Sequence, residues 1–189
     1  MKLNKNSKRR KELVAIAAQL FCNQGYESTT VRMLADVMGI KSGSLFHHFN
    51  DKQEILYAVI ESGMLHAMEI TQQRLALAHT PKERLHALAR AHLSTLLEDR
   101  NAHVVALYEW RSLVETSRDS LVKLRDAYEA SWREVINECH EAGLIQGDQS
   151  LQRHMALGAL NWTVQWYRPE GKLSPDELAK ELVAMVLRE

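Results

Sequence analysis

The sequence predicts an all-helical protein. Apolar residues recur every three to four positions along most of the chain, and no segment alternates apolar and polar residues as a strand would. Only 8 Gly and 3 Pro occur among 189 residues, of which 46% are hydrophobic. This composition suits one or two helical domains with a substantial core, and the pattern of stripes and caps predicts nine helices.

Three helices are expected at the N-terminus. The first covers about residues 8–24, with an apolar stripe at Leu13, Ile16, Ala17, Leu20 and Phe21. The second has its stripe at Val31, Leu34, Ala35 and Met38. Thr29 can accept backbone N–H bonds as its N-cap, and Gly39 can close its C-terminus. A third helix over about residues 42–49 would then present Ser44, Phe46, His47 and His48 away from Leu45 and Phe49.

Six further helices follow. Asp51 and Glu54 form a capping box for a long helix over residues 52–75, and Thr80, Pro81 and Glu83 mark the start of the next. The later helices are expected over about residues 102–114, from about residue 121 to Ala142, over about residues 150–167, and from Ser174 to the C-terminus. The long helix over residues 52–75 leaves the N-terminal segment and is the natural lever between the two parts.

Charge is unevenly distributed, although the net charge is zero. Residues 1–56 hold nine basic against five acidic residues, a charge of +4, and residues 57–189 hold fifteen against nineteen, or −4. A basic N-terminal segment suits contact with phosphates. The basic run at residues 8–11 is expected to reach the DNA backbone or minor groove, and the alternative is a solvated charge run.

The pair of short helices around Gly39 has the pattern of a helix-turn-helix. Its residues resemble, in order and spacing, those of the tetracycline-repressor (TetR) family of bacterial transcriptional regulators. The resemblance rests on Phe21, Gly25, Tyr26, residues 29–31, Leu34, Ala35, Gly39, Ile40, residues 42–49 and residues 52–56. Two positions depart from the family pattern. Lys41 stands where Ser or Thr often caps the reader helix, so Ser42 is expected to take over that cap, and Phe46 replaces a Tyr that contacts phosphate.

The resemblance implies a nine-helix fold in which a DNA-binding domain, residues 1–56, precedes an effector-binding and dimerisation domain, residues 57–189. It implies a homodimeric repressor that places two reader helices in successive major grooves of a near-palindromic operator, and a small-molecule effector that releases it. The residues expected to contact DNA are Arg10, Thr29, Thr30, Lys41, Ser42, Gly43, Ser44, Phe46, His47, His48 and Lys52.

The eighth expected helix is apolar on more than one side. One stripe contains Leu151, Met155, Gly158, Trp162 and Trp166, and another contains Leu157, Leu160, Val164 and Tyr167. One stripe can fill the core while the other meets a second copy, as the last two helices do in the family. Met155, Gly158 and Trp162 are therefore expected at a dimer interface, and the alternative is a helix buried entirely in the core.

Aromatic and cationic residues concentrate in the C-terminal part, which contains all four tryptophans. As a group they can line a pocket for a flat ring and an anionic group: Trp110, Arg111, Tyr128, Trp132, Arg133, Trp162, Trp166 and Arg168. Residues 161–173 also look like those of TetR-family regulators of fatty-acid and sterol breakdown, whose effectors are acyl-coenzyme A (acyl-CoA) thioesters. Core packing of each Trp remains the alternative, as does a sensor of drugs or other aromatic compounds.

The sequence contains no catalytic motif, which disfavours a helical enzyme. No cofactor or metal is expected, because adjacent His47 and His48 point about 100° apart and lack a carboxylate partner. The zero net charge and the large C-terminal part argue against a sequence-nonspecific architectural DNA protein. Cys22 and Cys139 are expected as small buried hydrophobes, and the absence of an apolar signal region or membrane span predicts a cytoplasmic protein.

Overall fold

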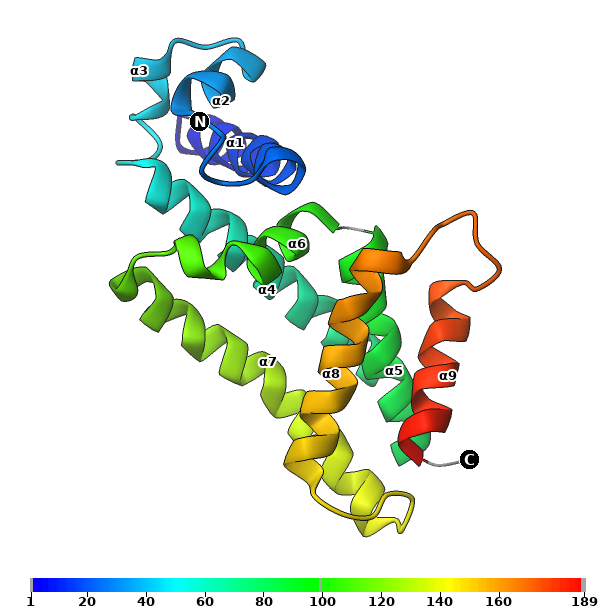
Figure 1. The fold of residues 1–189 in the computed structure, drawn as a ribbon. Coiled ribbons are helices and arrows are strands. Elements are labelled where there is room, and N and C mark those ends of the chain that lie inside the picture. The colour runs from blue at the N-terminus through cyan, green and yellow to red at the C-terminus, as the bar shows by residue number, and fades with distance from the viewer. Residues whose placement is uncertain (1, 99, 188–189) are drawn as a thin grey trace. The chain divides into compact units, whose positions relative to one another are not determined.

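The computed structural model describes residues 2–98 and 100–187, and its regular elements there are all helical, as expected (Figure 1). The α-helices are α1 Lys2–Gln24, α2 Val31–Val37, α3 Ser42–Leu45, α4 Lys52–Leu75, α5 Pro81–Leu93, α6 Arg100–Tyr108, α7 Glu115–Glu141, α8 Gln149–Trp166 and α9 Pro175–Leu187. A π-helix, Ser94–Glu98, follows α5, and a 3₁₀ helix, Trp110–Ser112, follows α6. None of the described helices is both long and apolar enough to cross a membrane.

Three helix boundaries differ from those expected. α1 begins at Lys2 rather than near residue 8, since no Gly or Pro interrupts the chain before Gly25. α3 ends at Leu45 rather than Phe49, because the backbone bonds tighten to a spacing of three residues at His47 and His48. α6 ends at Tyr108 instead of continuing to residue 114, where the 3₁₀ helix takes its place.

The chain packs as two units whose limits differ from the expected division after residue 56. The first unit contains the chain up to Met64 together with Asn101–Val122, and the second contains Leu65–Arg100 and the chain from Lys123 onward. In the first unit, α1, α2 and α3 gather around the beginning of α4 (Figure 1). Its core is built from fully buried side chains on these helices: Leu13, Phe21, Leu34, Leu45, Phe49 and Ile55.

Two polar side chains explain why residues 101–122 belong to the first unit. Glu109 accepts hydrogen bonds from the backbone N–H of Tyr26 at 2.9 Å and from the Ser112 hydroxyl at 2.8 Å. Gln53 donates to the Tyr26 hydroxyl at 3.0 Å and to the Ser112 carbonyl at 2.7 Å, and it accepts from the Val114 N–H at 3.0 Å. These bonds tie the α6–α7 connection to the turn after α1 and to the start of α4.

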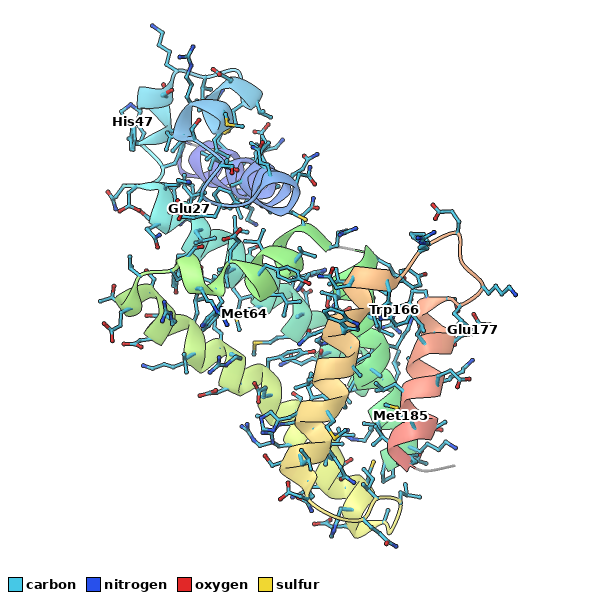
Figure 2. The ribbon with its side chains drawn as sticks, in the orientation of Figure 1. Glu27, His47, Met64, Trp166, Glu177 and Met185 are labelled. Atoms are coloured by element: carbon cyan, nitrogen blue, oxygen red, sulfur yellow. The ribbon has the colours of Figure 1, made fainter. Side chains whose placement is uncertain are left out.

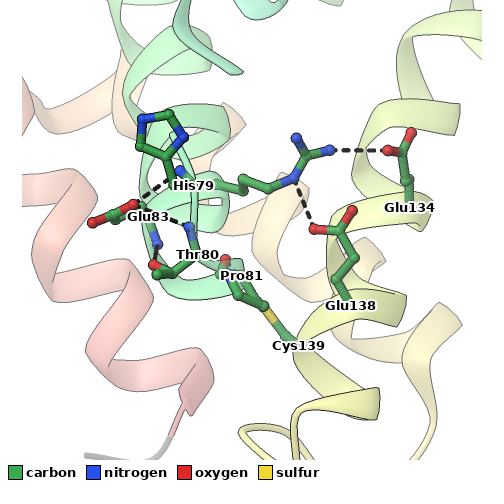
Figure 3. Close-up of polar contacts among 8 residues, drawn as sticks. His79, Thr80, Pro81, Glu83, Glu134, Glu138 and Cys139 are labelled. Carbon is green, nitrogen blue, oxygen red and sulfur yellow. Dashed lines mark hydrogen bonds and ion pairs between the residues drawn. The ribbon is translucent and has the colours of Figure 1, made fainter. Parts of the chain in front are cut away.

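The second unit is built around α5, which packs against α8 and α9. Thr80 and Glu83 form the expected capping box, with the Glu83 N–H donating to Thr80 Oγ1 and the Thr80 N–H to the Glu83 carboxylate (Figure 3). Arg84 on α5 pairs with Glu134 at 2.9 Å and Glu138 at 2.7 Å on α7. These contacts fix the start of α5 against α7.

Cys139 is fully buried on α7, next to Glu138 in sequence, and its thiol donates to the Pro81 carbonyl oxygen at 3.4 Å. Burial raises the pKa of the Cys139 thiol to about 11, so it stays protonated and unreactive. The expectation of a small buried hydrophobe is confirmed for Cys139. Cys22 is half-buried in α1.

A polar cluster lies within the second unit, next to its apolar core. The Tyr128 hydroxyl on α7 lies 2.8 Å from His92 Nδ1, and His92 Nε2 lies 3.0 Å from Asn161 Oδ1 on α8. The amide oxygen can only accept, so Nε2 carries the proton and Nδ1 accepts from Tyr128. The ring is therefore neutral, and burial lowers the pKa of His92 to about 4, opposed in part by the bond to Asn161.

We expect this neutral histidine to make the folded state sensitive to acid. An unfolded histidine takes up a proton near pH 6.5, whereas folded His92 does so only near pH 4. The contribution of neutral His92 to the free energy of unfolding should therefore be fully present above pH 6.5. It should fall by about 3 kcal/mol as the pH drops towards 4. Urea unfolding of the parent and of His92→Gln is measured at several pH values. The contribution of His92 is the difference between the two slopes of unfolding free energy against pH.

The same substitution at His140, on the exposed side of α7, is the control, because that ring faces water in the folded protein. His140→Gln should follow the parent curve. Parallel curves for the parent and His92→Gln would contradict the assignment of a buried neutral ring.

Candidate nucleic-acid interface and effector region

The turn between α2 and α3 has the geometry expected of a helix-turn-helix. Gly39 adopts a left-handed backbone with φ of +64°, which residues with a side chain rarely occupy. Its N–H donates to the Asp36 carbonyl at 3.1 Å, and the Ile40 N–H donates to the Ala35 carbonyl at 3.0 Å. These two bonds close α2 as a Schellman motif and direct the chain into α3.

α3 buries one side and exposes the other. Leu45 and the following Phe49 are fully buried in the first unit. Lys41, Gly43, Phe46 and His47 are exposed, and Ser42, Ser44 and His48 are half-buried. Figure 2 shows His47 at the outer edge of this segment, pointing away from α1. The exposed groups offer hydrogen-bond donors and acceptors that can reach base edges and phosphates.

Capping at the two short helices differs from expectation. Thr30, not Thr29, is the N-cap of α2, and its hydroxyl accepts from the Met33 N–H at 3.2 Å. Thr29 is fully buried, and its hydroxyl donates to the Gly25 carbonyl at 2.8 Å. Thr29 therefore shapes the turn after α1 instead of facing solvent as a DNA contact would. Lys41 occupies the N-cap position of α3 without a side-chain bond, so Ser42 does not replace the missing cap.

Arg10 and Lys52, two expected phosphate contacts, have partners within the first unit. The Arg10 guanidinium lies 4.4 Å from the centre of the Phe49 ring and 3.8 Å from the Glu54 carboxylate. The Lys52 ammonium lies 4.0 Å from the centre of the Tyr26 ring and donates to the Glu27 carbonyl at 3.4 Å. Desolvation lowers the pKa of Lys52. Both cations thus stabilise the packing of α1 and α4 as well as adding positive charge.

The residues expected to form an effector pocket belong to both units, and those in the second unit differ in burial. Trp110 and Arg111 lie in the 3₁₀ helix of the first unit. The remaining six lie in the second unit: Tyr128, Trp132, Arg133, Trp162, Trp166 and Arg168. Trp132 is fully buried, whereas Trp162 is 63% exposed. These six side chains therefore differ in burial, and their gathering around one ligand stays a prediction.

α8 exposes the apolar stripe that contains Met155, Gly158 and Trp162. Met155 is 65% exposed, and a Cβ placed on Gly158 would meet no atom within 4 Å. The opposite side of α8 is buried through Ala156, Leu160 and Thr163. Trp166 continues the exposed stripe at the end of α8 and lines a groove of about 290 Å³, which Met185 of α9 also lines. Figure 2 labels Trp166 on α8 and Met185 on α9. The second unit therefore exposes an apolar stripe along α8, and Met185 is exposed on α9.

The hydrogen-bonding roles of four polar residues that organise the two units were not predicted from the sequence: Gln53, Glu109, His92 and Asn161. A signal existed for His92, which falls in the same helical stripe as Leu85, Leu88 and Ala89 and so had to enter the core. Gln53, Glu109 and Asn161 carry no comparable signal, because their partners are distant in sequence.

Known proteins match both parts of the chain. Residues 13–59 match the family described as bacterial regulatory proteins, tetR family, and residues 78–189 match the tetracyclin repressor-like C-terminal domain. The HTH-type transcriptional repressor KstR2 of Mycolicibacterium smegmatis is 32% identical over 183 residues, covering 95% of this chain and 89% of that protein.

Two crystal structures have closely similar folds. The superantigen PfiT is 43% identical with a TM-score of 0.82, over 94% of this chain and 95% of that chain. AibR, solved in complex with isovaleryl coenzyme A and operator DNA, is 25% identical with a TM-score of 0.87, over 95% of this chain and 98% of that chain. With a matching N-terminal helix-turn-helix, a matching C-terminal domain and a full-length repressor relative, this chain belongs to the TetR family of transcriptional regulators.

Proposed function

We propose that this protein is a homodimeric transcriptional repressor that leaves its operator when an acyl-CoA thioester binds. The observation that carries the proposal is the α2–α3 turn closed by Gly39, which presents Lys41, Gly43 and His47 outward from a fully buried Leu45. Residues 1–56 form the DNA-binding part in this proposal, and the remainder binds the effector and the second copy.

Two residues of the α3 segment are expected to have different roles, one in DNA affinity and the other in DNA specificity. Lys41 is exposed at the start of α3, so Lys41→Ala should weaken binding to operator and random DNA alike. The slope of log affinity against log salt should fall by about 0.9 for each phosphate that the variant no longer neutralises. His47→Ala should instead reduce discrimination between operator and random DNA, by about 1–3 kcal/mol if it reads a base edge. Fluorescence anisotropy at several salt concentrations measures both effects.

Lys41 suits this test better than Lys52 or Arg10, whose replacement would also remove contacts to Tyr26 or Phe49. Lys172→Ala, which removes one exposed charge from the second unit, is the control and should change neither quantity. If Lys41→Ala and His47→Ala altered affinity and specificity in the same proportions, the assigned roles would be wrong.

The exposed face of α8 and α9 supports a dimer. An uncovered apolar stripe of this length is costly in water and suits a two-fold interface in which the same surface meets itself. Such an interface would place two reader helices on half-sites about 34–36 Å apart. Gly158 would allow the two copies of α8 to approach closely.

A charge at this face should therefore separate the subunits. Gly158→Glu is expected to yield a monomer with unchanged helical content and no measurable operator binding, since one reader helix meets only one half-site. Sedimentation velocity measures the oligomeric state, circular dichroism the helical content, and fluorescence anisotropy the operator binding. Ala130→Glu on the exposed side of α7 introduces the same charge elsewhere and should remain dimeric. An intact dimer in Gly158→Glu would place the interface elsewhere.

An acyl-CoA effector is supported by the kinship with AibR and by the chemistry of the second unit. AibR was solved with isovaleryl coenzyme A and operator DNA. In this chain, Trp166 is 49% exposed beside an apolar groove and can stack on a flat ring such as adenine. A sensor of aromatic drugs is the alternative, since such a ligand would use the same indole ring.

Operator release distinguishes the two ligand classes. Isovaleryl-, octanoyl- and cyclohexanecarbonyl-CoA, the matching free acids and a set of aromatic drugs are added to the protein on labelled operator. We expect release by thioesters and not by the free acids, and a weaker response in Trp166→Ala because adenine can no longer stack on the indole. Release by drugs or free acids without any response to thioesters would sink the acyl-CoA proposal.

A further inference from the structure

A short segment of the C-terminal family domain is built into the unit that contains the helix-turn-helix. Residues 78–189 match the tetracyclin repressor-like C-terminal domain, yet Asn101–Val122 pack with α1, α2 and α3 in the first unit. Within this segment, residues 109–114 connect α6 to α7 and include the 3₁₀ helix. This α6–α7 connection therefore can act on the DNA-binding helices directly, although it follows α4 and α5 in the chain.

One end of the connection holds the turn that leads from α1 into α2. Glu109 Oε1 accepts from the Tyr26 N–H at 2.9 Å, and a Cβ placed on Gly25 would lie 3.6 Å from the same oxygen. Tyr26 is buried, and its carbonyl accepts from the Thr29 N–H at 3.2 Å. The next residue, Thr30, is the N-cap of α2. The Glu109 carboxylate is therefore joined to the start of α2 through one hydrogen-bonded turn.

The other end of the connection holds the start of α4. Gln53, the second residue of α4, donates to the Ser112 carbonyl at 2.7 Å and accepts from the Val114 N–H at 3.0 Å. The same amide donates to the Tyr26 hydroxyl at 3.0 Å. The Ser112 hydroxyl in turn donates to Glu109 Oε2 at 2.8 Å, which closes the network. Two side chains thus join the connection to the α1–α2 turn and to α4.

The two helix starts that this network joins flank the reader segment in the chain. Thr30 lies at the start of α2 and Lys52 at the start of α4, and both are expected to contact DNA. The connection itself is held in place by Leu113, which is 3% exposed and whose carbonyl accepts from Arg118 at 2.9 Å. A connection anchored in this way fixes the spacing between the starts of α2 and α4.

We propose that Glu109 and Gln53 are positioning residues for DNA recognition, which hold the starts of α2 and α4 at the spacing that the reader segment needs on its operator. This inference rests on the proposed DNA contacts. Hydrogen bonds to base edges require groups held to within about 0.5 Å, whereas attraction to phosphates tolerates displacement. Loss of the positioning should therefore lower the affinity for operator and leave the affinity for random DNA unchanged.

Two neutral replacements of Glu109 separate geometry from charge. Glu109→Gln and Glu109→Leu each remove one negative charge, but only Gln keeps an oxygen that can accept from the Tyr26 N–H. Glu109→Leu should bind operator about tenfold more weakly than Glu109→Gln, because the Tyr26 N–H loses its partner and the turn shifts. Both variants should bind random DNA equally and with the same salt slope. Fluorescence anisotropy measures these affinities, with a duplex that the parent selects from randomised DNA as the operator.

A double-mutant cycle tests whether the two residues act together. Gln53→Leu should also lower the ratio of operator affinity to random-DNA affinity. Combining it with Glu109→Leu should lower that ratio by less than the product of the two single effects. Gln73→Leu is the matched control on the same helix, because the exposed Gln73 amide donates to Glu69 one turn away, and it should keep the ratio of the parent. Circular dichroism and thermal unfolding verify that each variant is folded.

The outcomes separate this inference from the proposed function. Equal losses of operator and random-DNA affinity in Glu109→Leu would mean that the network only stabilises the fold, and would overturn the positioning role. Parent-like operator binding in both Leu variants would overturn it as well. Independent, fully additive effects would remove the joint action of Glu109 and Gln53. If the parent selected no sequence from the randomised DNA, the operator-binding function itself would fall.

Discussion

The requirement that buried polar groups find partners inside the molecule governs both units of this protein. In the first unit, Thr29 is buried and bonded within the turn after α1, and Glu109 and Gln53 supply side-chain partners for backbone groups far away in sequence. In the second unit, the start of α5 is closed by Thr80, and His92 meets partners on α7 and α8. The packing of the helices follows from these pairings as much as from apolar area.

Exposed apolar side chains coincide with the place where a second copy is proposed to bind. Met155 and Trp162 keep large apolar surfaces in water. Another apolar surface would cover them. A folded chain retains such an unfavourable feature most readily where a binding event removes it.

Two helices, not one, run continuously from one unit into the other. α4 belongs to the first unit up to Met64 and to the second from Leu65, and α7 changes unit between Val122 and Lys123. The lever expected from the sequence was α4 alone. Glu109 and Gln53 bond the segment before α7 to the turn after α1 and to the start of α4, all within the first unit.

The sequence by itself determined the helical class, the α4 limits at residues 52–75, the Thr80 cap and the Gly39 turn, because each depends on residues within one or two helical turns. Local patterns also placed the reader segment, although they misassigned the α2 cap to Thr29. Only the tertiary structure decided that His92 meets Asn161, 69 residues away, and that the six candidate effector residues of the second unit are divided between buried and exposed faces. Helical periodicity shows that a residue lies on a stripe, but the neighbouring helices decide which stripe is covered and which polar groups meet beneath it.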